Sequence, residues 1–312
     1  MSRSLSLSDF SKEQGLALVT KPLYGWATMQ ALNGKITKLT GIKFKEKLQL
    51  FDTDAVFLAG HCGGSESGTT TYSNREITVA ELRIEEGICL ADFNKKYTQE
   101  FLSAGSYAES FDGINDWSTR KVDVASRQME NAVWRGDTNS NDQNLKHFDG
   151  WLKVIDSVSG STVAPTGVTG FTSGNAISVA QAIFNAIPAD ILYRDDLFIA
   201  MGLDHYRTLV NAYYNSNNFN FNITQSTLAG GILSFTLPAT NITVYGFPGM
   251  TGSSRIIATY APNLAFGTDS EADLEGGKLW YSEDDDELKI RVKWKAGCQV
   301  YFPDLIVRYA TA

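Results

Sequence analysis

The 312-residue sequence has only three cysteines and three histidines, and it has no apolar run long enough to cross a membrane. An odd number of scattered cysteines, Cys62, Cys89 and Cys298, does not form a disulfide framework, so we expect buried free thiols. A membrane-spanning helix needs about 18 or more consecutive apolar residues, and the sequence contains none. The start of the chain also lacks the apolar stretch of a secretory signal, and we therefore expect the protein to fold in a cytoplasm.

The histidines and cysteines also fail to form a catalytic or metal-binding pattern. His61 with Cys62 and Cys89 offers at most three of the four ligands that tetrahedral zinc needs. The glycine-rich stretch 63–68 lacks the Lys-Ser or Lys-Thr ending of a phosphate-binding loop. The acidic run 269–275 has Leu274 where a calcium loop requires glycine. We therefore expect a protein that is not an enzyme and that binds neither a cofactor nor a metal.

Charge is distributed very unevenly along the chain. The formal net charge is −8, and residues 269–287 alone carry nine acids against one base, so the rest of the chain is neutral. Residues 35–47 carry five lysines against one glutamate. The overall negative charge argues against a general nucleic-acid binder, which needs a basic face.

Two interpretations of these charged segments remain open. They are solvated faces that keep the protein soluble, or they are complementary surfaces that orient one copy of the chain against another. Under the second interpretation the candidate inter-subunit contacts are Lys35, Lys38, Lys43, Lys45, Lys47, Asp269, Glu271, Asp273, Glu275, Asp284, Asp285 and Asp286.

Hydropathy periods predict a mixed α+β chain. Residues 1–34 show weak periodicity and predict an arm that becomes ordered only against protein. Alternation after Ile36, with Ile42, Phe44, Leu48 and Leu50 inward, predicts a strand, and the small polar residues 61–71 predict the tip of a long hairpin. These patterns place a projecting β-structure near the start of the chain.

Helical spacing follows the hairpin. One helix is predicted over 91–104, and a longer one from Asp112 to Arg135, stopped by Gly136. At about 1.5 Å per residue the second helix is on the order of 35 Å long. Further elements are predicted as helices at 177–187 and 204–214 and as strands at 197–201, 256–260, 278–281, 287–294 and 299–309. The terminal sheet needs a cover for its apolar face, and the long helix is the candidate.

The order of these elements resembles that of the major capsid proteins of tailed bacteriophages with the Hong Kong 97-type fold. The resemblance covers about residues 35–309, and a short motif at 85–93 resembles a variant found in phages that infect Bacteroidetes. The segments that carry it are Arg135-Gly136-Asp137, Phe148-Asp149-Gly150-Trp151-Leu152 and Phe266-Gly267-Thr268-Asp269, each in its place between the arm, the hairpin, the long helix and the terminal sheet.

The resemblance implies an α+β capsid fold with five parts. These are an N-terminal arm at 1–34, an extended β-hairpin loop at 35–90, a peripheral domain with a spine helix at 91–160, an axial α+β domain at 161–255, and a return to the peripheral sheet at 256–312.

The resemblance also implies a function. The chain is expected to assemble into pentamers and hexamers of an icosahedral shell that encloses double-stranded DNA without reading its sequence. Its expected partners are other copies of itself, with separate scaffold, portal and decoration proteins, and no membrane. Assembly is expected in the bacterial host cytoplasm, and the product is the virion capsid. The alternatives are an encapsulin-like nanocompartment shell, a hydrolase and a tail-tube component.

Overall fold

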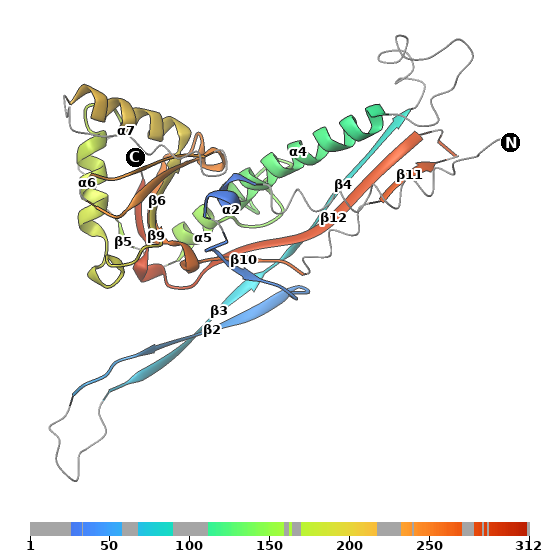
Figure 1. Ribbon diagram of the computed structural model, residues 1–312. Helices are drawn as coiled ribbons and strands as arrows, with labels where there is room; N and C mark the ends of the chain where they lie inside the picture. The colour runs from blue at the N-terminus through green and yellow to red at the C-terminus, as the bar shows by residue number, and fades with distance from the viewer. Residues whose placement is uncertain are drawn as a thin grey trace.

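The computed structural model describes residues 26–32, 34–57, 68–89, 112–158, 162–163, 170–216, 232–238, 240–269, 278–282, 284–285 and 287–310. Figure 1 shows a body built from two sheets with their helices, and a thin two-stranded hairpin that projects from that body.

The first sheet, called the long sheet below, combines strands from both ends of the sequence. Its order is β1 (Thr37–Leu39), β10 (Leu264–Gly267), β12 (Glu287–Val300) and β11 (Lys278–Ser282), and β4 (Ala80–Cys89) pairs with β12. The pairing of β4 with β12 is antiparallel over ten residues of each strand, from Ala80 opposite Ala296 to Cys89 opposite Glu287. The longest pairing in this sheet therefore joins two strands from distant parts of the chain.

The helix α4 (Asp112–Arg135) covers the long sheet, as the sequence predicted (Figure 1). Its residues Met129 and Val133 share one buried cluster with Val292 and Trp294 of β12. The helix ends just before Gly136, a position that only glycine fits, because a Cβ there would lie 2.5 Å from the carbonyl oxygens of both Ala132 and Phe148. The predicted bounds of the long helix are therefore confirmed, and so is its role as the cover.

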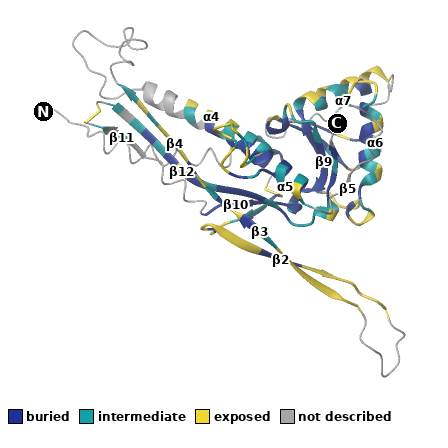
Figure 2. Cartoon of the chain, turned by 180° about the vertical axis from the view of Figure 1, so that it is seen from behind, coloured by how far each residue is buried: buried dark blue, intermediate teal, exposed yellow. Residues whose placement is uncertain are grey.

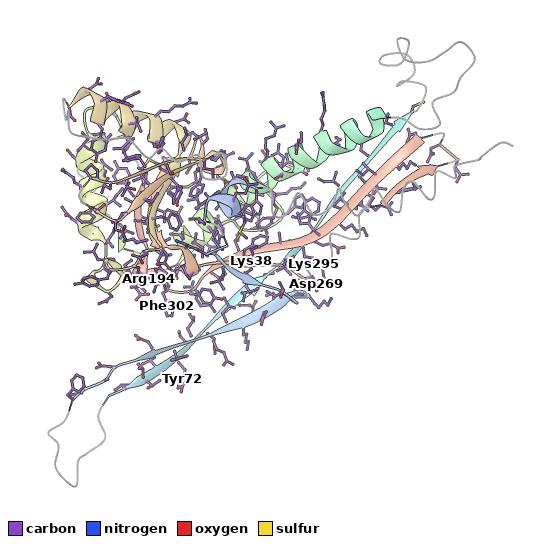
Figure 3. The ribbon with its side chains drawn as sticks, viewed as in Figure 1. Lys38, Tyr72, Arg194, Asp269, Lys295 and Phe302 are labelled. Carbon is purple, nitrogen blue, oxygen red and sulfur yellow. The ribbon has the colours of Figure 1, made fainter. Side chains whose placement is uncertain are left out.

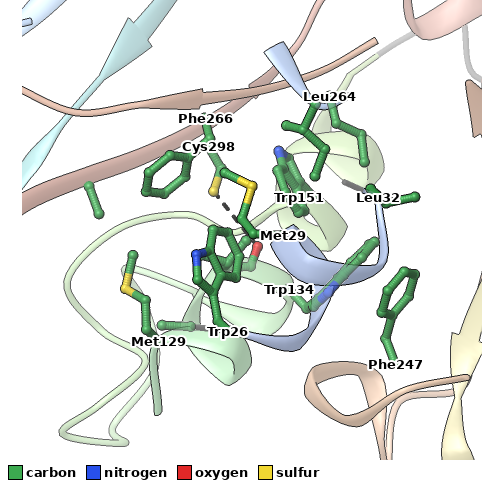
Figure 4. Close-up of a cluster of buried hydrophobic side chains, with 14 of the residues drawn as sticks. Trp26, Met29, Leu32, Met129, Trp134, Trp151, Phe247, Leu264, Phe266 and Cys298 are labelled. Carbon is green, nitrogen blue, oxygen red and sulfur yellow. Dashed lines mark hydrogen bonds between the residues drawn. The ribbon is translucent and has the colours of Figure 1, made fainter. Parts of the chain in front are cut away.

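The core beneath α4 is rich in tryptophan. Trp26, just before α2 (Ala27–Ala31), stacks on Trp151 at the start of α5 (Trp151–Ser157), with ring centroids 6.2 Å apart. Trp134 of α4 meets the edge of Trp151 at 5.0 Å (Figure 4). The sequence predicted that the arm is ordered by contact with protein, and for residues 26–32 that protein is the core of their own chain. The earlier part of the arm lies outside the described residues.

The second sheet has six strands and its own core. Its order is β5 (Thr162–Val163), β13 (Val307–Ala310), β9 (Arg255–Tyr260), β6 (Leu197–Gly202), β8 (Thr243–Phe247) and β7 (Leu233–Thr236). The helices α6 (Ala176–Ala186) and α7 (Leu203–Asn215) pack on it through one buried apolar cluster. The predicted helices near 177–187 and 204–214 and the buried strand at 197–201 are confirmed.

The end of the chain differs from the prediction. The sequence predicted two strands, at 287–294 and 299–309. In the structure the first strand, β12, continues without a break to Val300. A short 3-10 turn (Pro303–Leu305) follows it, and the second strand, β13, begins only after that turn. The last strand belongs to the other sheet, where it pairs with β9. The chain therefore crosses between the two sheets at this turn. The helix predicted over 91–104 lies outside the described residues.

The projecting hairpin consists of β2 (Lys45–Thr53) and β3 (Thr70–Thr78), which pair antiparallel. Leu48 and Ile77 anchor its base in a small buried cluster with Ala265 of the long sheet. Most of its other residues are exposed (Figure 2). Phe44 was predicted to face inward, but its side chain is 64% exposed, because it precedes the strand whose inward positions are Leu48 and Leu50.

Candidate functional site

The hairpin exposes large aromatic side chains that do not pack against the body of the chain. Phe51 of β2 and Tyr72 of β3 lie opposite each other in register, and their side chains are 68% and 79% exposed. Figure 3 labels Tyr72 on the projecting hairpin. Phe57, beyond the end of β2, is fully exposed. An isolated two-stranded hairpin is only marginally stable in water, and exposed apolar patches mark interaction surfaces. The hairpin is therefore the leading candidate for a contact with another molecule.

At the base of the hairpin, one buried aspartate joins two lysines. The Asp269 carboxylate meets Lys43 Nζ at 2.7 Å and Lys295 Nζ at 2.9 Å (Figure 3 labels Asp269 and Lys295). Hydrogen bonds from these two lysines hold the pKa of Asp269 below its usual range. Lys295 also donates a hydrogen bond to the main-chain oxygen of Lys43, at 3.0 Å. This triad ties the approach to β2 to strand β12 within a single chain.

The other lysines of the basic cluster lie around the same base. Lys45 on β2 is paired with Glu76 on β3 at 2.5 Å, and the neighbouring Lys47 is exposed. Lys35 is exposed after α2, whereas Lys38 is half-buried on β1. Lys43 and Lys45 therefore already have partners in their own chain.

The acidic half of the predicted set is only partly described. Asp284 and Asp285 are exposed in the turn between β11 and β12, the two strands that the sequence predicted at 278–281 and 287–294. A hydrogen bond from Lys289 lowers the pKa of Asp285. The positions that lie outside the described residues are Glu271, Asp273, Glu275 and Asp286.

Within the described part of the predicted set, the structure brings Lys43 and Asp269 together, but inside one chain. The sequence interpretation had them meet between copies. The sequence interpretation also missed Lys295, which follows the acidic segment by several residues and belongs to neither charged cluster. Lys295 alternates with apolar residues along β12, and this pattern could have placed it on the open face of the strand.

A second polar group is buried beside the tryptophan core. The Glu130 carboxylate accepts hydrogen bonds from the Thr28 main-chain N–H at 3.0 Å and from the Thr28 hydroxyl at 2.5 Å. The Trp134 indole N–H donates to the same hydroxyl at 2.7 Å. Burial raises the pKa of Glu130, while these hydrogen bonds oppose the shift. Glu130 thus links α2 to α4 through a buried network, and sequence periodicity alone did not reveal it.

The described residues contain no cluster of three or more histidine, cysteine, aspartate or glutamate side chains able to hold a metal ion. Cys298 is buried, and burial raises the pKa of its thiol. His61 and Cys62, two of the three possible ligands considered from the sequence, lie outside the described residues. Across the described part of the chain, no helix is both long and apolar enough to span a membrane.

No protein-family profile and no curated protein matches the sequence. Solved structures do match the fold. A chain of the satellite phage P4 procapsid, which includes the size determination protein, superimposes with a TM-score of 0.59 at 12% identity, covering 100% of this chain and 92% of that chain. A chain from the capsid of the empty GTA particle has a TM-score of 0.58 at 13% identity, covering 91% and 90%. The virus-like particle of Pyrococcus furiosus has a TM-score of 0.54 at 9% identity, covering 96% and 99%.

The chain has the Hong Kong 97-type capsid fold. The likeness extends over nearly the whole of each chain. The α+β class and the capsid fold predicted from the order of the sequence elements are both confirmed.

Proposed function

We propose that this chain is the major capsid subunit of a tailed bacteriophage. Many copies form the pentamers and hexamers of an icosahedral shell that encloses double-stranded DNA. The observation that carries the proposal is the whole-length likeness to chains of capsids and procapsids, combined with a hairpin that exposes aromatic side chains away from its own body. Assembly takes place in the bacterial host cytoplasm, with separate scaffold, portal and decoration proteins as further partners.

The geometry suits a subunit that contacts its neighbours asymmetrically. The hairpin projects from one side of a body in which α4 packs on the long sheet (Figure 1). A projecting element that engages a different surface on the next copy makes a heterologous contact, and such contacts generate closed rings when the rotation between copies closes. The hairpin of one copy therefore lies across the body of the next copy in a capsomer.

Charge complementarity supplies orientation in this arrangement. Lys43 is held by Asp269 and Lys45 by Glu76, so Lys35 and Lys47 are the exposed lysines of the cluster that meet acids of a neighbouring copy. Asp285 is likewise held by Lys289, so the acids that meet them are Asp284 of the exposed turn, with Glu271, Asp273, Glu275 and Asp286. Such pairs affect the rate and register of docking more than its affinity.

The charge contribution is tested by Lys47→Glu, with Lys146→Glu as a control that makes the same charge change on an exposed loop. We expect Lys47→Glu to slow assembly at low ionic strength and the difference to shrink as salt screens the charges. Light scattering after concentration of the purified subunits measures the rate. Equal rates for the two variants at low salt would remove the role of Lys47 in docking.

The function itself is tested by negative-stain electron microscopy of the purified protein at high concentration. Closed shells of uniform size are the expected result. Particles recovered from a lysed virus-producing culture should contain nuclease-protected DNA, whereas an encapsulin-like shell should contain a folded cargo protein. A small monodisperse species that never assembles, with a saturable hydrolytic activity, would contradict the proposal.

A further inference from the structure

We propose that Tyr24 occupies a groove beside α4 of its own chain, so that the N-terminal arm is anchored on the long helix before α2 begins. This inference goes beyond the proposed function, because it concerns a contact within one subunit and is tested on subunits that have not assembled.

The groove lies where the start of the described chain meets α4. It holds about 300 Å³, and most of its surface is apolar. An apolar cavity of about 150 Å³ is large enough to hold a benzene ring, so the groove has room for one large aromatic side chain. Its walls come from the start of α2, from α4 and from the 3-10 turn at Pro248–Met250, and they include Trp26, Ala27, Ser126, Glu130, Asn131 and Pro248.

The position of the groove along the chain favours an occupant from the same molecule. Trp26 is the first residue of the described chain and also a wall of the groove. Consecutive Cα atoms are about 3.8 Å apart, so the Cα of Tyr24 lies within about 7.6 Å of the Cα of Trp26. A side chain tethered at so short a distance has a high effective concentration at the groove. A segment of a second molecule would have to displace it.

The backbone at Trp26 favours Tyr24 over its neighbours. Trp26 is extended, with φ −77° and ψ 144°, and its side chain lies in the buried cluster (Figure 4). Side chains two residues apart in an extended chain point to the same side. A chain that approaches Trp26 in this conformation therefore directs Tyr24 toward the body and Leu23 away from it, while Gly25 between them has no side chain.

The chemistry of tyrosine matches the walls of the groove. Trp26, Ala27 and Pro248 offer apolar surface to an aromatic ring. Ser126 and Asn131, both half-buried on α4, offer polar groups to a phenolic hydroxyl. Buried tyrosines combine these two features, because the ring contributes apolar contact area and the hydroxyl finds a hydrogen-bond partner.

The groove also adjoins the hydrogen bonds that hold α2. Glu130 lines it, and the Glu130 carboxylate accepts hydrogen bonds from the main-chain N–H and the hydroxyl of Thr28. A tyrosine in the groove covers this carboxylate and adds a second anchor next to it. Local opening of α2 therefore has to break the contact of Tyr24 as well as the bonds of Thr28.

A photo-reactive side chain tests the position of residue 24. p-Azidophenylalanine at position 24 has nearly the shape of tyrosine, and the same probe at position 23 is the matched control. The full chain is irradiated below the concentration at which it assembles, and adducts are mapped by mass spectrometry after the single-chain band is separated on a denaturing gel. We expect the probe at 24 to attach to Ser126, Asn131 or Pro248 of its own chain, and the probe at 23 to give at least about tenfold less of these adducts.

Three results of this experiment would overturn the inference. They are the absence of groove adducts from position 24, equal labelling of the groove from positions 23 and 24, and groove adducts found only between two chains.

Hydrogen exchange measures what the contact contributes. The amides of Gln30 and Leu32 donate to the main-chain oxygens of Trp26 and Thr28, so their exchange reports the opening of α2. Tyr24→Ala should speed this exchange by about tenfold or more, as expected when a buried aromatic side chain is lost. Tyr24→Phe keeps the ring and should speed it by only about threefold, and Leu23→Ala should leave it unchanged.

The amides of β6 in the second sheet serve as the internal reference, because unchanged exchange there shows that the subunit remains folded. Exchange of Gln30 and Leu32 that is as slow in Tyr24→Ala as in the wild type would contradict the anchor. Neither outcome depends on whether the wild-type chain forms shells, so the failure of this inference and the failure of the proposed function are separate results.

Discussion

Replacing Trp134 by alanine should remove the central contact between α4 and the rest of the core. The side chain is 1% exposed, its ring centroid lies 5.0 Å from that of Trp151 and 5.2 Å from that of Phe247, and its N–H donates to Thr28. Truncating a buried tryptophan to alanine costs about 3–5 kcal/mol, because apolar contacts are lost and a cavity remains. The total free energy of unfolding of a typical protein is about 5–15 kcal/mol, so this is a large fraction of it.

The conservative change Trp134→Phe separates packing from hydrogen bonding. It keeps a ring in the cluster but removes the donor to the Thr28 hydroxyl, and we expect a smaller loss of about 1–2 kcal/mol. The control Arg127→Ala, on the exposed side of the same helix, should change stability by less than about 0.5 kcal/mol.

Urea unfolding followed by far-ultraviolet circular dichroism measures these differences. The subunit must be kept below the concentration at which it assembles, because association stabilises the folded state by mass action. If Trp134→Ala loses less than about 1 kcal/mol, α4 does not depend on the tryptophan cluster, and the packing argument for the long helix is wrong.

Three further perturbations follow from individual contacts. Burial raises the pKa of Glu130 in the folded state, so its contribution to stability is present at low pH and falls as the pH rises through that raised pKa. Glu130→Gln should therefore flatten the pH dependence of the free energy of unfolding, measured between about pH 4 and about pH 8. Hydrogen bonds from its two lysines lower the pKa of Asp269, so its contribution to stability is present at neutral pH and is lost as the pH falls. Asp269→Asn should lower the thermal midpoint at neutral pH and remove the loss of stability in acid. An unchanged pH profile of the thermal midpoint would contradict the triad. Gly136→Ala should destabilise the fold by more than about 1 kcal/mol in the same urea assay, because its Cβ would collide with backbone oxygens that cannot move away, and a neutral effect would show that the turn can relax.

The parts of the fold that were predicted correctly are those with strong local patterns. The period of 3.6 residues is continuous from Asp112, and a glycine follows Arg135, so both ends of α4 were visible in the sequence. The buried strand β6 was found because an unbroken apolar run lies between turn residues. In each of these elements the local preference and the tertiary environment agree, so no long-range information was needed.

The elements that were missed depend on contacts distant in sequence. Strand β10 has only four residues, and it is held by β1 on one side and by β12 on the other. The end of β12 was predicted too early because Gly297 interrupts the alternation. The strand continues there because Gly297 packs directly against the backbone of Thr78, where a Cβ would not fit. Neither feature can be inferred from a window of neighbouring residues.

For the candidate site, the sequence alone determined the composition of the surface: a basic segment at 35–47, an acidic one at 269–287, and a hairpin between them. It also determined the class and order of most elements, because hydropathy period and turn residues act locally. Only the tertiary structure decided which charges pair. Strands β1 and β10 run parallel, with Leu39 opposite Gly267, and this register carries the residues that follow each strand, Lys43 and Asp269, into contact. Coulomb attraction between side chains matters at separations of a few ångströms, and those separations are set by strand register rather than by position in the sequence.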